Sequence, residues 1–243
     1  MSARRLQIGA PGFCFGRSKR TVFACLAADG GDMIKAVVFD KDGVLLDSEA
    51  EYDRRRKVFF AEQGIDDSAF PDFYGSNNDE IWRTVEPVDH ARRAELFENF
   101  IQHFKNEPMV YADYIYPEAE RALRAIRDAG YMTALASSSP RTYIDKFLAA
   151  AGFDVLFDYV VSGEECARHK PFPDVYFNAF SALGVEPSEV VVVEDSPKGI
   201  AAAKAAGAYV IARRVPSSPG IDQSLADERV ATLDEVLPRV RAL

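Results

Sequence analysis

Short apolar runs recur along the chain and alternate with segments of helical periodicity. Five runs rich in β-branched residues predict buried parallel strands at residues 34–39, 131–136, 159–161, 190–193 and 208–212. Four intervening segments that begin with proline predict helices at residues 117–129, 140–151, 173–183 and 197–206. This strand–helix alternation predicts an α/β fold, a doubly wound parallel sheet with right-handed crossovers.

One region breaks the alternation. Residues 48–114 predict helices at 49–63, 79–85 and 89–105 with no strand between them, and the apolar positions of the last helix recur with a period near 3.6. We therefore expect a helical cap domain of residues 48–114, inserted into an α/β core domain of residues 33–47 and 115–243. The cap should hinge near residues 46–49 and 112–117.

Residues 1–32 differ from the rest of the chain in charge. They carry five basic residues against two acidic ones, followed by one short apolar run at residues 21–28. That run is at the lower length limit for a signal peptide, and a disordered tail is a second interpretation. We favour a third, in which translation begins at Met33 and residues 1–32 are an extension that is not native.

Composition narrows the class of function. The formal net charge of −9 over 243 residues disfavours a nucleic-acid-binding surface. No apolar run approaches the roughly 18–20 residues that span a bilayer. Three scattered cysteines indicate a reducing, cytoplasmic compartment, and with only three histidines any bound metal should be a hard cation held by oxygen. We expect a monomer that binds a small molecule, and neither nucleic acid nor membrane.

Residues suited to phosphate chemistry follow the first two predicted strands, at the sheet edge where α/β proteins bind ligands. Asp40 and Asp42 leave the first strand in the pattern DxDG, which places two carboxylates in one loop or forms a simple acidic turn. Ser137 and Ser138 leave the second strand just before a helix. Hydroxyl and N–H groups there are typical of an anion site, although N-capping by Ser139 alone also fits.

Charged residues follow the third and fourth strands in the same way. Lys170 precedes a helix start, where it is suited to neutralise a phosphate or a carboxylate, or is a solvated loop lysine. Glu194 and Asp195 directly follow a buried apolar run. Charges at that place are costly unless they are paired or bound to a cation, and an N-cap with helix-dipole acids is the alternative interpretation.

Together the four motifs are far more specific than each is singly. The set resembles the haloacid-dehalogenase superfamily from residue 33 to about residue 214. The helical insertion resembles the cap of the branch that contains β-phosphoglucomutase and many small-molecule phosphatases. The resemblance implies that Asp40 is the nucleophile, that Asp42 is the general acid and base, and that Ser137, Ser138 and Lys170 bind phosphate.

The resemblance also implies a cofactor, Mg²⁺. Its ligands would be a carboxylate oxygen of Asp40, the backbone carbonyl of Asp42 and the carboxylate of Asp195, with Glu194 supporting this shell or binding directly. A dehalogenase or a phosphonate-cleaving enzyme would not need Asp42, and a non-catalytic binding module would lose Asp40 or Lys170. The expected function is therefore a Mg²⁺-dependent phosphatase that releases phosphate from a small phosphorylated metabolite through an aspartyl phosphate.

A β-phosphoglucomutase-type phosphomutase is the serious alternative. Mutases of this branch carry a histidine where this chain has Tyr52, and an arginine in a cap loop where it has Asn78, which favours the hydrolase. A compensating charge from Arg54, Arg55 or Arg56 leaves the mutase open. We take Tyr52, the loop residues Ser76, Asn77 and Asn78, and also Arg56, as candidate substrate-specificity residues. For each of them, cap folding or solvent exposure is the simpler explanation.

Overall fold

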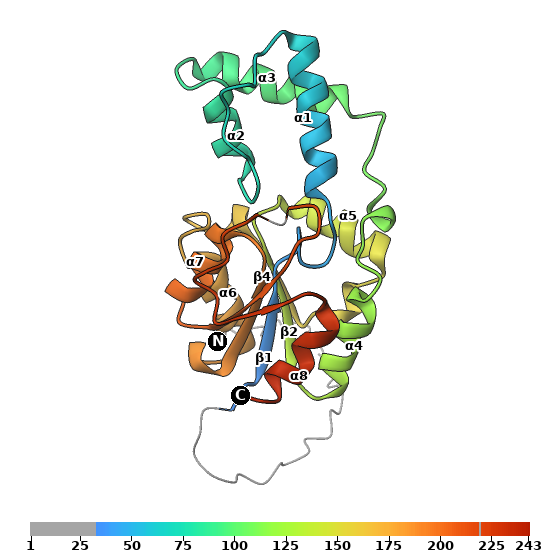
Figure 1. The fold of residues 1–243 in the computed structure, drawn as a ribbon, viewed down its shortest axis with the longest axis vertical. Helices are drawn as coiled ribbons and strands as arrows, with labels where there is room; N and C mark the ends of the chain where they lie inside the picture. The colour runs from blue at the N-terminus through green and yellow to red at the C-terminus, as the bar shows by residue number, and fades with distance from the viewer. Residues whose placement is uncertain (1–32, 219) are drawn as a thin grey trace, which may run out of the picture. The chain divides into compact units, whose positions relative to one another are not determined.

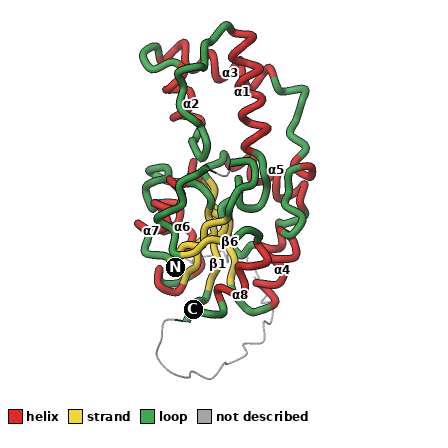
Figure 2. The backbone as a smooth tube through the Cα atoms, in the orientation of Figure 1, coloured by secondary structure: helices red, strands yellow, loops and turns green. Residues whose placement is uncertain are grey.

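The computed structural model describes residues 33–218 and 220–243. Our interpretation of residues 1–32 lies outside the described residues. Six parallel strands form one sheet in the order β3-β2-β1-β4-β5-β6 (Figures 1 and 2). They are β1 (Ala36–Phe39), β2 (Met132–Ser137), β3 (Tyr159–Ser162), β4 (Val190–Glu194), β5 (Tyr209–Arg213) and β6 (Glu228–Val230). Strand order reverses between β1 and β4, which makes their carboxyl ends the switch point at which such sheets bind ligands.

Helices cover both faces of the sheet (Figure 1). Val37 and Phe39 of β1 pack with α4, α5 and α8, whereas Ala36 and Val38 pack with α6 and α7. The bounds are α4 (Ala119–Asp128), α5 (Arg141–Ala151), α6 (Asp174–Leu183), α7 (Pro197–Ala205) and α8 (Val236–Val240). Because both faces are covered, every residue of β1 is buried, which explains its unbroken apolar run. The predicted doubly wound α/β fold is confirmed.

The differences from the sequence prediction are local. A proline at the first helical position holds only for Pro197 of α7, since Pro140 and Pro173 are N-caps and Pro117 precedes the N-cap of α4. The edge strand β6 and the short helix α8 were not predicted. Short 3₁₀ helices, also not predicted, occupy Tyr111–Asp113, Asp154–Leu156, Gly163–Glu165, Pro187–Glu189 and Leu233–Glu235.

Three helices follow β1 without an intervening strand: α1 (Glu49–Gln63), α2 (Asn78–Val85) and α3 (His90–His103). They enclose a hydrophobic cluster of their own. The ring centroid of Phe59 lies 5.9 Å from that of Trp82 and 5.4 Å from that of Phe100, both in edge-to-face geometry. We call these helices and their loops the cap; its bounds at residues 48 and 114 stay a prediction that this separate cluster supports. None of the helices in the described part of the chain is long and apolar enough to cross a membrane.

The two segments that join cap and core run side by side. Leu46 and Ile115 form an antiparallel bridge. The N–H of Asp47 donates to the carbonyl of Tyr114 at 2.8 Å, and the N–H of Tyr116 donates to the carbonyl of Leu45 at 3.0 Å. Both segments lie at the hinges expected from the sequence.

Candidate active site

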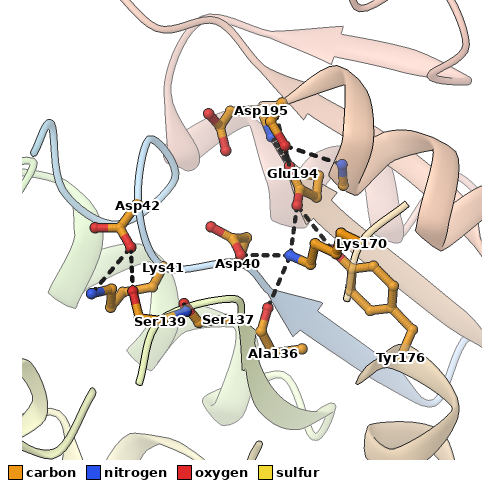
Figure 3. Close-up of polar contacts among 12 residues, drawn as sticks. Asp40, Lys41, Asp42, Ala136, Ser137, Ser139, Lys170, Tyr176, Glu194 and Asp195 are labelled. Atoms are coloured by element: carbon orange, nitrogen blue, oxygen red, sulfur yellow. Dashed lines mark hydrogen bonds and ion pairs between the residues drawn. The ribbon is translucent and has the colours of Figure 1, made fainter. Parts of the chain in front are cut away.

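The four motifs converge at the carboxyl ends of the strands (Figure 3). Phe39, the last residue of β1, pairs with Leu135 of β2 and with Val193 of β4. The residues that follow this register therefore lie beside one another, and the N–H of Asp40 donates to the carbonyl of Val193 at 2.9 Å. Parallel pairing alone thus brings together side chains that are far apart in the sequence.

Lys170 lies at the centre of the cluster and is only 7% exposed. Its Nζ donates to Asp40 Oδ1 at 2.6 Å, to Glu194 Oε1 at 2.7 Å and to the carbonyl of Ala136 at 3.2 Å. Burial acts to lower the pKa of Lys170, but the two carboxylates hold it well above its ordinary value. The lysine is therefore a fixed positive charge between two buried anions.

The carboxylate of Glu194 is fully engaged by protein donors. Oε1 accepts from Lys170 and from the hydroxyl of Tyr176 at 3.1 Å, and Oε2 accepts from the N–H groups of Asp195 at 2.7 Å and Ser196 at 2.9 Å. Burial acts to raise the pKa of Glu194, yet Lys170 and these N–H groups hold it below its ordinary value. A Cβ at residue 199 would lie 1.6 Å from Oε1, so only the glycine present there leaves room for this carboxylate.

Asp40, Glu194 and Asp195 each offer an oxygen within 4.8 Å of the others, which fits a hard cation. Among the described residues, no hydrogen-bond donor contacts Oδ2 of Asp40 or Oδ1 of Asp195. The pKa of Asp40 is raised to about 7. Burial is the main cause, Lys170 opposes it, and the charges of Glu194 and Asp42 add to it. Such crowding of carboxylates disfavours their charged forms unless a further cation is bound. The donor set therefore fits Mg²⁺.

Asp42 lies outside this trio of carboxylates, and its side chain is grouped with those of Lys41 and Ser139 (Figure 3). It accepts hydrogen bonds from Ser48 Oγ at 2.5 Å and Ser139 Oγ at 2.9 Å, and Lys41 Nζ lies 3.1 Å away. Ser139 is thus engaged with a carboxylate, and the N-cap of α5 is Pro140. The expected metal contact of Asp42 through its backbone carbonyl stays a prediction.

Sequence reasoning missed three residues of this site. The hydroxyl of Tyr74, in the cap, donates to Asp195 Oδ2. The side chain of Lys41 is completely buried beside Asp42, and Ser139 also contacts Asp42. For Lys41 there was a usable signal, because it lies between the two aspartates of the first motif, directly after a buried strand. No local pattern indicates Tyr74, which depends on how the cap meets the core.

A cavity of about 370 Å³ lies above the carboxylates. Its core side includes Asp40, Asp42, Ser137, Ser138 and Lys170, and its cap side includes all the candidate specificity residues, Tyr52, Arg56, Ser76, Asn77 and Asn78. Two of the latter also have structural roles. Ser76 Oγ accepts from Lys198 of α7 at 3.1 Å, and Asn77 Oδ1 caps α2 by accepting from the N–H of Glu80 at 3.0 Å.

Fold and site together define an α/β enzyme that works with carboxylates beneath a helical insertion. The chain belongs to the haloacid dehalogenase-like hydrolase family, whose model matches residues 34–207. This confirms the predicted family and enzyme class.

Relatives agree with this assignment over most of the chain. The present chain is 31% identical over 215 residues to hexitol phosphatase B of Escherichia coli strain K12, and the match covers 84% of this chain and 94% of that protein. It is also 30% identical over 192 residues to the validoxylamine A 7'-phosphate phosphatase of Streptomyces hygroscopicus subsp. limoneus, a match that covers 74% of this chain and 85% of that protein. The crystal structure of CbbY from Rhodobacter sphaeroides in complex with phosphate shares the fold, with a TM-score of 0.66, 24% identity and coverage of 84% and 96%.

Proposed function

We propose that this protein is a Mg²⁺-dependent phosphatase that hydrolyses a phosphate monoester of a small metabolite. One observation carries the proposal: Asp40 is held by Lys170 at 2.6 Å on the floor of the cavity, with the carboxylates of Glu194 and Asp195 beside it. The phosphatases among the relatives support the same class of reaction.

In the first half of the reaction, an oxygen of Asp40 attacks phosphorus and the bond to the ester oxygen breaks. Asp42 gives its proton to the departing oxygen, which leaves as an alcohol. In the second half, Asp42 takes a proton from water as that water attacks the aspartyl phosphate. Asp40 is released and phosphate departs, so one group serves as acid and then as base.

The remaining residues hold the transferring group. Lys170 and the hydroxyls of Ser137 and Ser138 line the cavity beside Asp40, where they are suited to bind phosphate oxygens. Asp40 and Asp195 would hold Mg²⁺ through their free oxygens, while Glu194 orients Lys170 and the backbone of Asp195. A bound Mg²⁺ would neutralise charge that spreads over the phosphoryl oxygens in the transition state.

Hydrolysis is favoured over phosphate transfer between sugar hydroxyls. A mutase must grip a second phosphate at the distal end of its substrate, and a charge-assisted contact of that kind contributes about 1.5–3 kcal/mol. Tyr52 and Asn78, which line the cavity at the positions expected for that role, carry no charge.

The test follows the phosphate. Purified protein with Mg²⁺ is given a panel of phosphorylated metabolites, and β-glucose 1-phosphate with and without glucose 1,6-bisphosphate. We expect free phosphate from members of the panel and little glucose 6-phosphate. Efficient formation of glucose 6-phosphate with little free phosphate would establish the mutase instead.

A further inference from the structure

Arg56 is a buried arginine without a hydrogen-bond partner. It lies on α1, lines the cavity, and its side chain is 10% exposed. Within residues 33–218 and 220–243 no group forms a hydrogen bond with its guanidinium, and its Nε is fully buried without a partner. The nearest carboxylate oxygens, those of Glu49 and Asp53, lie 3.9 Å and 4.0 Å from its Nη2.

The same helix shows how arginines are satisfied here. Arg54 and Arg55 both donate to Glu51, at 2.8 Å and 2.7 Å. Arg56 comes next in sequence, and its side chain is far less exposed than that of Arg54. Leaving a buried charged donor unpaired costs more than an ordinary hydrogen bond contributes, and such groups in native structures call for an explanation. The four N–H donors on the two Nη atoms of Arg56 are therefore available to something that enters the cavity.

Glu49 supplies acceptors at the same place. It precedes Arg56 by seven residues, two helical turns, and so lies on the same face of α1. Its side chain lines the cavity, is 16% exposed and accepts no hydrogen bond from any described residue. Burial, and then Asp42, raise the pKa of Glu49 to about 8, while Arg56 lowers it. The N–H donors of Arg56 and the carboxyl oxygens of Glu49 thus line the same side of the cavity without a hydrogen bond between them.

We propose that Arg56 and Glu49 bind hydroxyl groups of the leaving group, so that the preferred substrates are phosphate esters of neutral polyols or sugars. This assignment of a specificity pair rests on the proposed phosphatase function. A hydroxyl both donates and accepts, and two neighbouring hydroxyls match an arginine beside a carboxyl group. A second anionic group on the substrate is not needed to balance the charge of Arg56, because the carboxylate of Asp53 already lies 4.0 Å from its guanidinium. The pair therefore favours a neutral partner over a carboxylate or a second phosphate.

The experiment compares two phosphate esters on matched variants. Sorbitol 6-phosphate carries hydroxyls for the pair, whereas p-nitrophenyl phosphate carries none. With Mg²⁺ present, Arg56→Met should lower kcat/KM for sorbitol 6-phosphate about 10- to 100-fold and change that for p-nitrophenyl phosphate less than about twofold. Glu49→Leu should act in the same direction. Arg54→Met is the control, because Arg54 lies on the same helix but is paired to Glu51. This variant should leave kcat/KM for both substrates unchanged.

A second readout separates specificity from folding. Because Arg56 is buried and makes no hydrogen bond with the described residues, Arg56→Met should keep or raise the melting temperature while it lowers activity on the polyol ester. Equal losses on both esters would overturn the proposal, as would unchanged kinetics. A wild-type preference for phosphoglycolate that Arg56→Met abolishes would also overturn it, since Arg56 would then bind an anion. Absence of wild-type activity on every ester, p-nitrophenyl phosphate included, would instead reject the phosphatase function itself.

Discussion

Core and cap line the same cavity but position their residues differently. In the core, Asp40, Ser137 and Glu194 stand at the ends of paired strands, and Lys170 ties the two carboxylates together at 2.6–2.7 Å. In the cap, Glu49 and Arg56 stand on one helix and make no hydrogen bond to each other. In the core, Lys170 binds two carboxylates, and the oxygens without a protein donor are those suited to hold a cation, whereas the cap leaves the donors of Arg56 and the acceptors of Glu49 unused. The difference agrees with the proposed roles, reaction at the core residues and substrate recognition at the cap residues.

The largest effect should come from the core nucleophile. Asp40→Asn keeps the shape of the side chain but removes the attacking carboxylate, so kcat should fall by at least about 10³-fold. Phosphate release with Mg²⁺ measures this, and thermal unfolding checks that the fold survives. Wild-type enzyme in EDTA should lose activity and regain it with added Mg²⁺. Near-normal turnover by the variant would remove Asp40 from the mechanism, and full activity in EDTA would remove the metal.

The next effect should be on stability in the core. Lys170→Met leaves Asp40 and Glu194 as buried, uncompensated carboxylates, which should lower the free energy of unfolding by about 3–5 kcal/mol. Urea unfolding in EDTA measures this. Arg56→Met, which removes a buried cation from the cap, is the matched comparison and should cost no stability. If both variants lost the same stability, the contrast between core and cap would be wrong.

The pH dependence of stability tests whether Glu49 of the cap is a buried carboxyl group without a hydrogen-bond donor. The pKa of Glu49 is about 8 in the folded protein against an ordinary value of 4.5. Between these pH values Glu49 keeps its proton in the folded protein, whereas the unfolded chain has lost it. The free energy of unfolding that Glu49 contributes is therefore fully present below pH 4.5 and is lost as the pH rises to 8. A pKa that differs by one between the folded and unfolded states corresponds to about 1.4 kcal/mol of stability. Glu49→Gln should therefore lose less stability than wild type between pH 5 and pH 8 in EDTA, as urea unfolding would measure; parallel pH profiles would contradict it.

The smallest effect concerns the contact between the two regions. Lys198 of α7 donates to Glu80 of α2 at 2.7 Å, and both side chains are about one-third exposed. Pairs of this exposure contribute up to about 1 kcal/mol. Lys198→Met should thus raise KM about two- to fivefold with little change in kcat. Lys204→Met, which breaks a pair with Asp227 inside the core, is the control, and an equal effect of both would contradict a role in cap closure.

The core part of the site was predictable because its positions follow from short-range patterns. Each apolar run marks a strand, the polar residue after it marks the sheet edge, and parallel pairing brings those ends together. Even there, the strands end one residue later than predicted at Ser137, Ser162 and Glu194, since the backbones of these polar residues still pair, Ser137 with Ser162 and Glu194 with Ala212. The three-residue edge strand β6 has too short a pattern to detect.

The cap part was not predictable in the same way. Three consecutive arginines precede Lys57, and i,i+3 or i,i+4 spacing offers Glu51 to two of them and Asp53 to the third. The sequence therefore does not reveal that Arg56 makes no hydrogen bond and stays 4.0 Å from Asp53. The contact of Tyr74 with Asp195, 121 residues away, depends on how a loop of the cap meets the core. Both the environment of Arg56 and the contact of Tyr74 depend on side-chain packing in three dimensions, which no local sequence pattern indicates.

The paired connections at Leu46 and Ile115 bear on how such proteins diversify. Because the chain enters and leaves the cap at one hydrogen-bonded crossing, the whole insertion can be exchanged without disturbing a single pairing of the sheet. On the division of roles proposed above, recombination between relatives at that crossing would keep the reaction and change the choice of substrate. In a lineage of such enzymes, catalysis and specificity are then inherited as separate units.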